Sequence, residues 1–348
     1  MRFNIINEST FSNKKVLFIF PSSFIGGHEL MSVEIIKGII SSGGEVTVGC
    51  REKLAVEKIF SDLDVNLINL PFSAQRMEIV HAVFNIFLLK KAIDFFKKIK
   101  NLFDEVIIVQ GDIELGSTYI HAARLANFKV TSYIPYAHNA KLTKKKLSII
   151  RDPLCLFAYN WCDSYITIYN NAALEIKSKN NNANVLIIKN KVRNLDSFKL
   201  KIKKYTKDKN ILKIYIIGRV YFAHKGHDRF LQSIKNIDKK LIHDIELNII
   251  GDGPDLDKFK RLALDIEDLK VNYLGWMSEP WEEAYKADLI VIPSRFEGVP
   301  LVMLEALELG IPIIASKIDG MIDYLGDDSL CDNVSDFREK ILTYMKDS

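Results

Sequence analysis

The chain has 348 residues, more than one hydrophobic core usually organises, so we expect two domains. Apolar residues make up 48% and charged residues 26% of the sequence, which excludes a disordered, collagen-like or coiled-coil protein. Charge is uneven, because residues 1–210 hold 31 Lys and Arg against 19 Asp and Glu, whereas residues 211–348 hold 17 against 25.

Strands and helices are expected to alternate through the first part of the chain. Short apolar, β-branched runs predict strands, and longer periodic runs predict helices. The strands fall at 16–20, 46–50, 65–70, 106–109, 130–134 and 185–188, and the helices at 29–41 and 117–126. This alternation is typical of a doubly wound parallel sheet, which places a first domain at 1–194. A stretch rich in Lys and Asn follows, and we interpret 195–210 as a linker.

The same alternation restarts after the linker. The predicted strands are 212–217, 246–250, 271–274, 289–293 and 313–315, and the predicted helices are 228–236, 256–266, 282–287, 300–309 and 335–345. The expected fold class is therefore α/β, with two Rossmann-like domains and a cleft between them. The second domain spans 211–333, and a C-terminal helix at 334–348 could pack back toward the first. Ligands of open α/β sheets bind at the carboxyl ends of the strands.

The segment that carries the most chemistry is PSRFEGVPLVMLEALELGIP, at 293–312. A buried strand runs into a loop with Glu297, Pro300 suits the first helical turn, and Gly310 suits a helix C-cap. The positive end of the helix therefore lies in the ligand-binding region and forms an anion site. Four residues would supply its backbone: Gly298, Val299, Pro300 and Leu301.

Glu297 and Glu305 are separated by seven residues, and carboxylate oxygens accept hydrogen bonds from sugar hydroxyls. In this sequence context the pair resembles the E-x7-E motif of retaining GT-B glycosyltransferases, particularly glycosyltransferase family 4. The alternative is an ordinary strand–loop–helix unit with two surface glutamates. The resemblance implies a GT-B fold and retaining transfer of a hexose-type sugar from a nucleotide-diphosphate sugar. It also implies that Glu297 orients the sugar and Glu305 binds ribose or sugar hydroxyls.

Two cations follow the first strand of the second domain. Gly218-Arg219 and Lys225-Gly226 resemble the G-R…K-G pair of the same family, which implies that Arg219 and Lys225 hold the donor diphosphate and stabilise its departure. The physical chemistry agrees, because two cations beside a helix amino terminus match a dianion that Arg can bind bidentately. The alternative is a pair of solvated loop cations.

Two further segments resemble parts of the donor site. Gly251-Asp252-Gly253-Pro254 is similar to the family's G-x-G-P turn, and we interpret its glycines chiefly as tight-turn residues, with a donor contact at Gly251. The sequence LGWMS, which contains Met277, resembles the segment whose backbone holds the donor base. Backbone recognition leaves little side-chain signature, so the identity of the base stays open.

The first domain matches the motifs of this family less closely than the second domain does. The sequence GGHE resembles a glycine-rich loop that approaches the donor phosphates and the acceptor, which implies donor contacts from Gly26 and Gly27 and an acceptor contact from His28. The sequence PYAHN resembles a motif that supplies a histidine to the donor sugar, so His138 is a candidate catalytic residue, although a lone His is more often structural. Asp112 follows another strand and is a candidate acceptor contact.

No metal ion or other cofactor is expected, because cations can neutralise the leaving diphosphate and the family likeness implies metal-free transfer. The pairs Asp62/Asp64 and Asp255/Asp257 lack the strand-end setting of a metal–nucleotide site, which favours capping or solvated roles. The four cysteines share no C-x-x-C spacing, which excludes a zinc site and favours a reducing compartment.

Membrane contact is a separate hypothesis. Residues 76–103 are rich in aromatic and aliphatic side chains, and residues 141–151 form a second basic patch. The basic stripe of the first segment consists of Lys90, Lys91, Lys97 and Lys98. Such segments can lie on an anionic membrane surface, and the alternative is a core-packing helix with a solvated lysine face. No apolar run is long enough to span a membrane or to form a signal peptide, so we expect a cytoplasmic protein that could be peripheral on the inner face of the membrane.

The expected partners are a nucleotide-sugar donor and a cell-envelope glycan or lipid-linked acceptor. A GT-B epimerase, a phosphorylase and a non-catalytic sugar-nucleotide-binding protein are the alternatives. A nucleic-acid partner is not expected, because the basic half lacks the interleaved aromatic and basic residues of an RNA-binding module.

Overall fold

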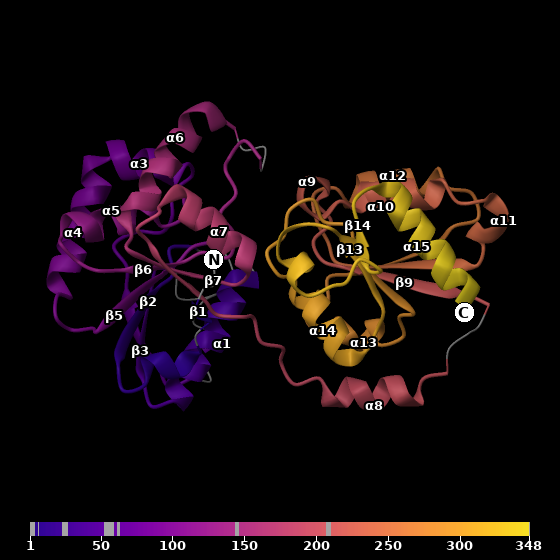
Figure 1. Ribbon diagram of the computed structural model, residues 1–348, viewed down its shortest axis with the longest axis horizontal. Helices are drawn as coiled ribbons and strands as arrows, with labels where there is room; N and C mark the ends of the chain where they lie inside the picture. The colour runs from indigo at the N-terminus through magenta and orange to yellow at the C-terminus, as the bar shows by residue number, and fades with distance from the viewer. Residues whose placement is uncertain are drawn as a thin grey trace. The chain divides into compact units, whose positions relative to one another are not determined.

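The computed structural model places the chain in two compact units, Met1–Lys191 and Val192–Ser348 (Figure 1). It describes residues 4–5, 7–22, 27–51, 59–60, 63–142, 146–206 and 210–347. Each unit is a parallel sheet with helices packed on it, as expected for two Rossmann-like domains.

The first unit contains a parallel sheet in the order β1-β8-β7-β6-β5-β2-β3-β4. Its strands are β1 (Asn4–Ile5), β2 (Lys15–Ile19), β3 (Glu45–Cys50), β4 (Asn66–Asn69), β5 (Glu105–Val109), β6 (Thr131–Tyr133), β7 (Ser164–Thr167) and β8 (Asn184–Ile187). The chain winds outward from β2 in one direction and from β5 in the other. The carboxyl ends of β2 and β5 therefore flank the topological switch point of this sheet.

Helices of the first unit cover both faces of the sheet, and its central strands β2 and β5 are nearly continuous apolar runs. They are α1 (Gly27–Ser41), α3 (Glu78–Phe84), α4 (Ile86–Lys98), α5 (Ser117–Leu125), α6 (Ser148–Ala158) and α7 (Asn170–Lys179), with short 3-10 helices at Glu8–Phe11 and Tyr159–Trp161. In β2, Leu17 and Ile19 share a core cluster with Phe96 of α4 and Ile120 of α5.

The second unit has a six-stranded parallel sheet in the order β11-β10-β9-β12-β13-β14. Its strands are β9 (Leu212–Ile217), β10 (Ile245–Ile250), β11 (Lys270–Gly275), β12 (Leu289–Ile292), β13 (Ile313–Ser316) and β14 (Leu330–Cys331). Counted along this unit, the order is 3-2-1-4-5-6, which is the Rossmann order. Its switch point lies between β9 and β12.

Helices also cover both faces of the second sheet (Figure 1). They are α8 (Asp196–Lys204), α9 (Phe222–Lys225), α10 (His227–Lys235), α11 (Lys239–Ile242), α12 (Leu256–Leu264), α13 (Trp281–Ala284), α14 (Leu301–Leu309) and α15 (Val334–Asp347), with a 3-10 helix at Asp319–Asp323. The C-terminal helix α15 contributes Phe337 and Ile341 to the core of this unit, where Phe337 contacts Phe230 of α10. This packing buries the apolar side chains of Phe337 and Ile341.

The stretch that we interpreted as a linker contains a helix. Helix α8 buries Phe198, and Lys199 forms an ion pair with Glu308 of α14. The compact units divide between Lys191 and Val192, a few residues before the boundary predicted at 194. Residues 196–204 are therefore part of the second unit.

The basic segment at 76–103 forms two helices, because Asn85 ends α3 and caps α4 by accepting a hydrogen bond from the backbone N–H of Leu88 (3.1 Å). Among the helices that the structure describes, none is long and apolar enough to cross a membrane. All four cysteines are buried free thiols.

Candidate functional site

The carboxyl ends of β9 and β10 and the segment that follows β11 enclose a pocket in the second unit. It has a volume of about 730 Å³ and lies beside the switch point, where Rossmann-like sheets bind ligands. Its lining consists of Ile217, Gly218, Arg219, Ile250, Gly251, Asp252, Gly253, Pro254, Trp276, Met277 and Pro280. Three of the residues predicted for the donor site, Arg219, Gly251 and Met277, are therefore brought together.

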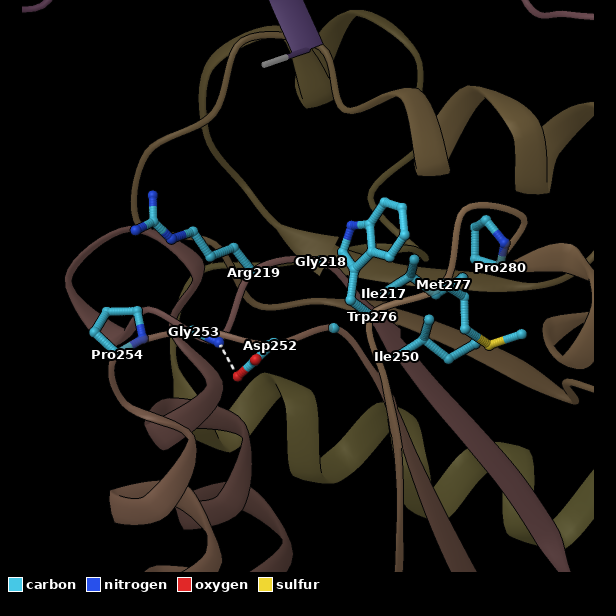
Figure 2. Close-up of a pocket in the computed structure, with 11 residues that line it drawn as sticks. Ile217, Gly218, Arg219, Ile250, Asp252, Gly253, Pro254, Trp276, Met277 and Pro280 are labelled. Carbon is cyan, nitrogen blue, oxygen red and sulfur yellow. Dashed lines mark hydrogen bonds between the residues drawn. The ribbon is translucent and has the colours of Figure 1, made fainter. Parts of the chain in front are cut away.

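The two ends of this pocket differ in character (Figure 2). Arg219 lies at one end beside Asp252 and Gly253, whereas Met277, Ile250 and Pro280 form an apolar end. Trp276 stands above the apolar end with 76% of its surface exposed. Such a pocket suits a ligand with an anionic group at one end and a flat apolar group at the other.

Two glycines allow the pocket floor to form. A Cβ atom at Gly251, where φ is +145°, would lie 2.1 Å from the carbonyl oxygen of Gly218. A Cβ atom at Gly253 would lie 2.3 Å from the carbonyl oxygen of Val220. The backbones that end β9 and β10 therefore touch, which agrees with the tight-turn role predicted for both glycines.

A second cluster surrounds Glu297, in the loop between β12 and α14. The Lys225 Nζ atom forms an ion pair with Glu297 Oε2, and Ser294 Oγ donates a hydrogen bond to the same oxygen (3.3 Å). The backbone N–H of Glu297 donates to Asp319 Oδ2 (3.0 Å). These contacts hold both the backbone and the carboxylate of Glu297 in place.

The loop that carries Lys225 is held against the Glu297 loop. A Cβ atom at Gly226 would lie 2.0 Å from the carbonyl oxygen of Pro293, so only glycine permits this approach. The guanidinium of Arg295 pairs with Asp228 (Nη2–Oδ2 2.8 Å), and its backbone N–H donates to the carbonyl of His224 (2.7 Å). Lys225 and Glu297 are therefore adjacent because the backbone at Gly226 packs directly against the backbone at Pro293.

His227 begins α10, two positions after Lys225, and is fully buried. Burial, together with the positive charge of Lys225, lowers the pKa of His227 to about 4. Its ring contacts Phe259 edge to face, with the ring centroids 5.9 Å apart. Near neutral pH this side chain is therefore uncharged.

Glu305 is on the first turns of α14, and its two oxygens have different partners. Arg193 Nε donates to Oε1 (2.8 Å), and Trp281 Nε1 donates to Oε2 (2.7 Å). Arg193 also pairs with Glu279 (Nη2–Oε1 2.6 Å). Glu305 is therefore an oriented hydrogen-bond acceptor and not a free surface carboxylate.

The start of α14 differs by one residue from the prediction. Pro300 is the N-cap, and the helix begins at Leu301. Gly310 takes a left-handed conformation (φ +69°) at the C-cap, as predicted. Gly298 and Val299 are buried in the loop that leads to the helix, and the carbonyl of Gly298 accepts a hydrogen bond from the backbone N–H of Gly320 (3.1 Å).

Two candidates of the first unit, His138 and Asp112, lie in the loops that follow β6 and β5. His138 follows β6, its side chain is 5% exposed, and its Nδ1 atom lies 3.7 Å from Glu175 Oε2. Hydrogen bonding to His138 lowers the pKa of Glu175 against the effect of burial. Asp112 Oδ1 accepts hydrogen bonds from the backbone N–H groups of Glu114 (3.0 Å) and Leu115 (3.2 Å). Both predicted ligand roles stay predictions.

Gly26 and Asp62 lie outside the described residues. Gly27 begins the described part of α1, and the side chain of His28 is not described. Asp255 accepts a hydrogen bond from the backbone N–H of Phe222 (2.7 Å), in line with a structural role. In the described part of the chain, no group of three or more His, Cys, Asp or Glu side chains could hold a metal ion.

Four residues that line the pocket or contact Glu297 or Glu305 were not predicted from the sequence: Arg193, Trp276, Trp281 and Asp319. Trp276 could have been found, because an exposed aromatic residue directly after a strand and within a recognised motif indicates a ligand contact. Arg193 carries no such signal. It lies 112 positions from Glu305, and only the fold brings the two together.

Known proteins share parts of this sequence and the whole of this fold. Residues 196–348 match the family model described as "Glycosyl transferases group 1". The lipopolysaccharide outer core galactosyltransferase WaaB, solved in its apo form, has the same fold, with a TM-score of 0.70 and 20% sequence identity. That match covers 96% of this chain and 90% of that one. The fold is therefore the GT-B fold of glycosyltransferases.

Two sequence relatives extend over most of the chain. An uncharacterised glycosyltransferase of Haemophilus influenzae is 27% identical, over 87% of this chain and 80% of its own length. The UDP-Gal:alpha-D-GlcNAc-diphosphoundecaprenol alpha-1,3-galactosyltransferase of Escherichia coli is 24% identical, over 90% of this chain and 82% of its own. Together with the family model, these relatives indicate a glycosyltransferase.

Proposed function

We propose that this protein is a retaining glycosyltransferase, of the family 4 type, that transfers a hexose from a nucleotide-diphosphate sugar to a cell-envelope acceptor. One observation carries the proposal. The cations Arg219 and Lys225 and the carboxylates Glu297 and Glu305 all lie within the second unit, around the carboxyl ends of β9 and β12 and the start of α14.

The cations suit the diphosphate of the donor. Arg219 is exposed, and it forms no ion pair with any residue that the structure describes, so its guanidinium is available for a bidentate phosphate contact. Lys225 is paired with Glu297, and a diphosphate dianion would compete for its ammonium group. The exchange frees the Glu297 carboxylate to accept hydrogen bonds from the sugar.

The nucleoside fits the other end of the pocket. Met277 and the exposed ring of Trp276 offer an apolar surface for a base, and Glu305 offers oriented lone pairs to ribose hydroxyls. The relative that acts on UDP-Gal supports a uridine nucleotide, although the contacts here are compatible with other bases.

The reaction breaks the bond between the anomeric carbon and the diphosphate oxygen and forms one to the acceptor oxygen. With attack on the same face, the acceptor proton passes to the leaving phosphate oxygen and configuration is retained. Arg219, Lys225 and the backbone of residues 298–301 stabilise the charge that grows on the diphosphate. No divalent cation is required by this scheme, because fixed protein cations take its place.

The acceptor is proposed to be a glycan or lipid-linked glycan of the cell envelope, reached from the cytoplasmic side. The diphosphoundecaprenol-linked acceptor named for the Escherichia coli relative and the lipopolysaccharide role named for WaaB support this class. Within the first unit, Gly26, Gly27 and His138 are proposed to complete the donor site, and His28 and Asp112 to contact the acceptor.

The proposal is tested with a panel of nucleotide sugars, scored by thermal shift and by release of the nucleoside diphosphate. We expect one UDP-hexose to raise the melting temperature and to be turned over in the presence of EDTA. A GT-B epimerase would convert the sugar without transferring it, and a non-catalytic binding protein would show the shift without turnover. Either result would refute the transferase assignment.

A further inference from the structure

Three aromatic side chains lie beside the Lys225–Glu297 ion pair, and the proposed chemistry gives none of them a role. The ring of Tyr221 stacks on the ring of His224, with the centroids 5.1 Å apart and the planes inclined by 21°. His224 in turn contacts Phe296 edge to face, with the centroids 5.9 Å apart. We call this row of three rings the aromatic shelf.

The aromatic shelf connects the groups that are assigned to the donor. At one end, the guanidinium carbon of Arg219 lies 6.0 Å from the centroid of the Tyr221 ring, which is the spacing of a cation–π contact. At the other end, Phe296 directly precedes Glu297 in the loop after β12. Since Arg219 is assigned to the diphosphate and Glu297 to the sugar, the shelf borders the place where the diphosphate joins the hexose.

The backbone that carries the shelf is fixed by contacts that do not involve its rings. The backbone N–H groups of Arg295 and Phe296 both donate to the carbonyl of His224 (2.7 and 3.4 Å). The guanidinium of Arg295 donates to the carbonyl of Phe222 (2.5 Å) and pairs with Asp228 (Nη1–Oδ1 2.6 Å). The two loops should therefore keep their positions when a ring is replaced, and the rings are preorganised for a ligand.

The shelf offers apolar surface that water can reach. Tyr221 is 37% exposed, and His224 and Phe296 are partly buried. Aromatic surface beside a few convergent polar groups is typical of a small-molecule site. A hexopyranose ring matches this surface, because one of its faces presents C–H groups, whereas the hydroxyls at its edge can still donate hydrogen bonds to a carboxylate.

We propose that the aromatic shelf binds the apolar face of the donor's hexose and so selects a nucleotide sugar over the bare nucleoside diphosphate. This inference rests on the proposed function, because it takes the donor to be a nucleotide sugar. Glu297 accepts hydrogen bonds from the hydroxyls of the sugar while the shelf contacts its C–H groups. A nucleobase is a poorer occupant, because Trp276 and Met277 offer it an apolar surface at the end of the pocket away from Arg219 (Figure 2).

The experiment is isothermal titration calorimetry of the full chain with nucleoside diphosphates and their hexose conjugates. The ligands are UDP with UDP-glucose and UDP-galactose, GDP with GDP-mannose, and ADP with ADP-glucose. Tyr221→Leu and Phe296→Leu should each raise the Kd of the hexose conjugate that the wild type binds by at least about fivefold, through lost ring contact with the sugar. The Kd of the matching diphosphate should stay within about twofold of the wild-type value, because both variants keep Arg219 and Lys225.

The matched control is Tyr273→Leu, which should bind every ligand like the wild type. Tyr273 of β11 is 39% exposed and contacts Phe259 edge to face (centroids 6.2 Å apart), so it resembles Tyr221 in exposure and ring contact but packs on α12.

The shelf proposal is overturned if Tyr221→Leu and Phe296→Leu weaken diphosphate and hexose conjugate equally, which would assign the rings to the nucleotide site or to the fold. It is also overturned if both variants bind the hexose conjugate as the wild type does. A wild type that binds the diphosphate and its conjugate, with variants that do not separate the two, refutes the shelf alone. A wild type that binds no member of any pair refutes the proposed function, and the shelf proposal with it.

Discussion

Lys225 and Glu297 form an ion pair across 72 positions of sequence. Lys225 ends α9, and Glu297 lies in the loop that follows β12. Their backbones meet where Gly226 touches the carbonyl oxygen of Pro293, a contact that any Cβ atom would prevent. The fold of the second unit therefore brings together Lys225, which is assigned to the leaving diphosphate, and Glu297, which is assigned to the sugar.

Arg219→Ala should weaken donor binding without weakening the fold. The side chain is exposed and has no ion pair among the described residues, so its loss should change the free energy of unfolding by less than about 0.5 kcal/mol. Loss of a charge-assisted diphosphate contact should raise the donor KM by at least about tenfold. Steady-state kinetics measures this, with the exposed Arg261→Ala on α12 as control. Equal KM values in Arg219→Ala and the control would show that Arg219 does not bind the donor.

Arg193→Ala should act through Glu305, which it orients. Losing the 2.8 Å contact to Glu305 Oε1 should raise the donor KM by roughly tenfold, with a smaller effect on kcat. Arg193→Lys should bring the donor KM only partly back to the wild-type value. An ammonium group cannot bind Glu279 and Glu305 in the planar geometry of a guanidinium. If Arg193→Ala lowers kcat and leaves KM unchanged, Glu305 does not act in donor binding.

Gly251→Ala should disrupt the pocket floor. The added Cβ atom would lie 2.1 Å from the carbonyl oxygen of Gly218, and alanine is strained at φ +145°. We expect a loss of at least about 2 kcal/mol in the free energy of unfolding, measured with urea. Gly326→Ala is the matched control, because nothing lies within 4 Å of its added Cβ atom. Equal urea midpoints for the two variants would contradict the close packing at Gly251.

The second unit should lose stability as the pH falls from about 6.5 toward 4. The pKa of His227 is lowered from 6.5 to about 4 in the folded state, so the unfolded chain binds the proton first. The stability contributed by the neutral form is complete above pH 6.5 and declines below it, by up to about 1.4 kcal/mol per pH unit. Urea unfolding between pH 4.5 and 7 should show this slope in the wild type.

The control for this prediction is a second histidine. His227→Leu should flatten the dependence on pH, whereas His243→Gln should not, because the His243 side chain is 65% exposed. A slope that is unchanged in His227→Leu would show that other groups cause it.

Much of the fold could be predicted because parallel strands buried on both faces are short, continuous apolar runs. The runs at 212–217 and 289–293 match β9 and β12 to within one residue. Strand β7 was not predicted because its sequence, SYIT, has only four residues, and helix α7 was not predicted because Asn and Lys at its two ends leave only a short apolar stretch. Helix α8 was interpreted as linker because its sequence is rich in Lys, in keeping with a helix that buries only Phe198.

Local motifs predicted part of the geometry around the pocket and Glu297. Arg219, Gly251 and Met277 line one pocket, and Lys225 contacts Glu297, as the motifs indicated. The partners of Glu305 were not predictable, because Arg193 and Trp281 reach it through tertiary packing alone. Local spacing specifies which groups a loop presents, whereas their orientation depends on contacts from distant segments.

The most direct measurement is turnover of the preferred nucleotide sugar by Lys225→Ala and Glu297→Gln, beside Glu282→Gln, an exposed glutamate of α13. Both site variants should fold and should lose on the order of 100-fold or more in kcat, because one removes a cation from the leaving diphosphate and the other a charge from the sugar site. Glu282→Gln should behave like the wild type. Wild-type rates in Lys225→Ala and Glu297→Gln would show that sugar transfer does not take place at this ion pair.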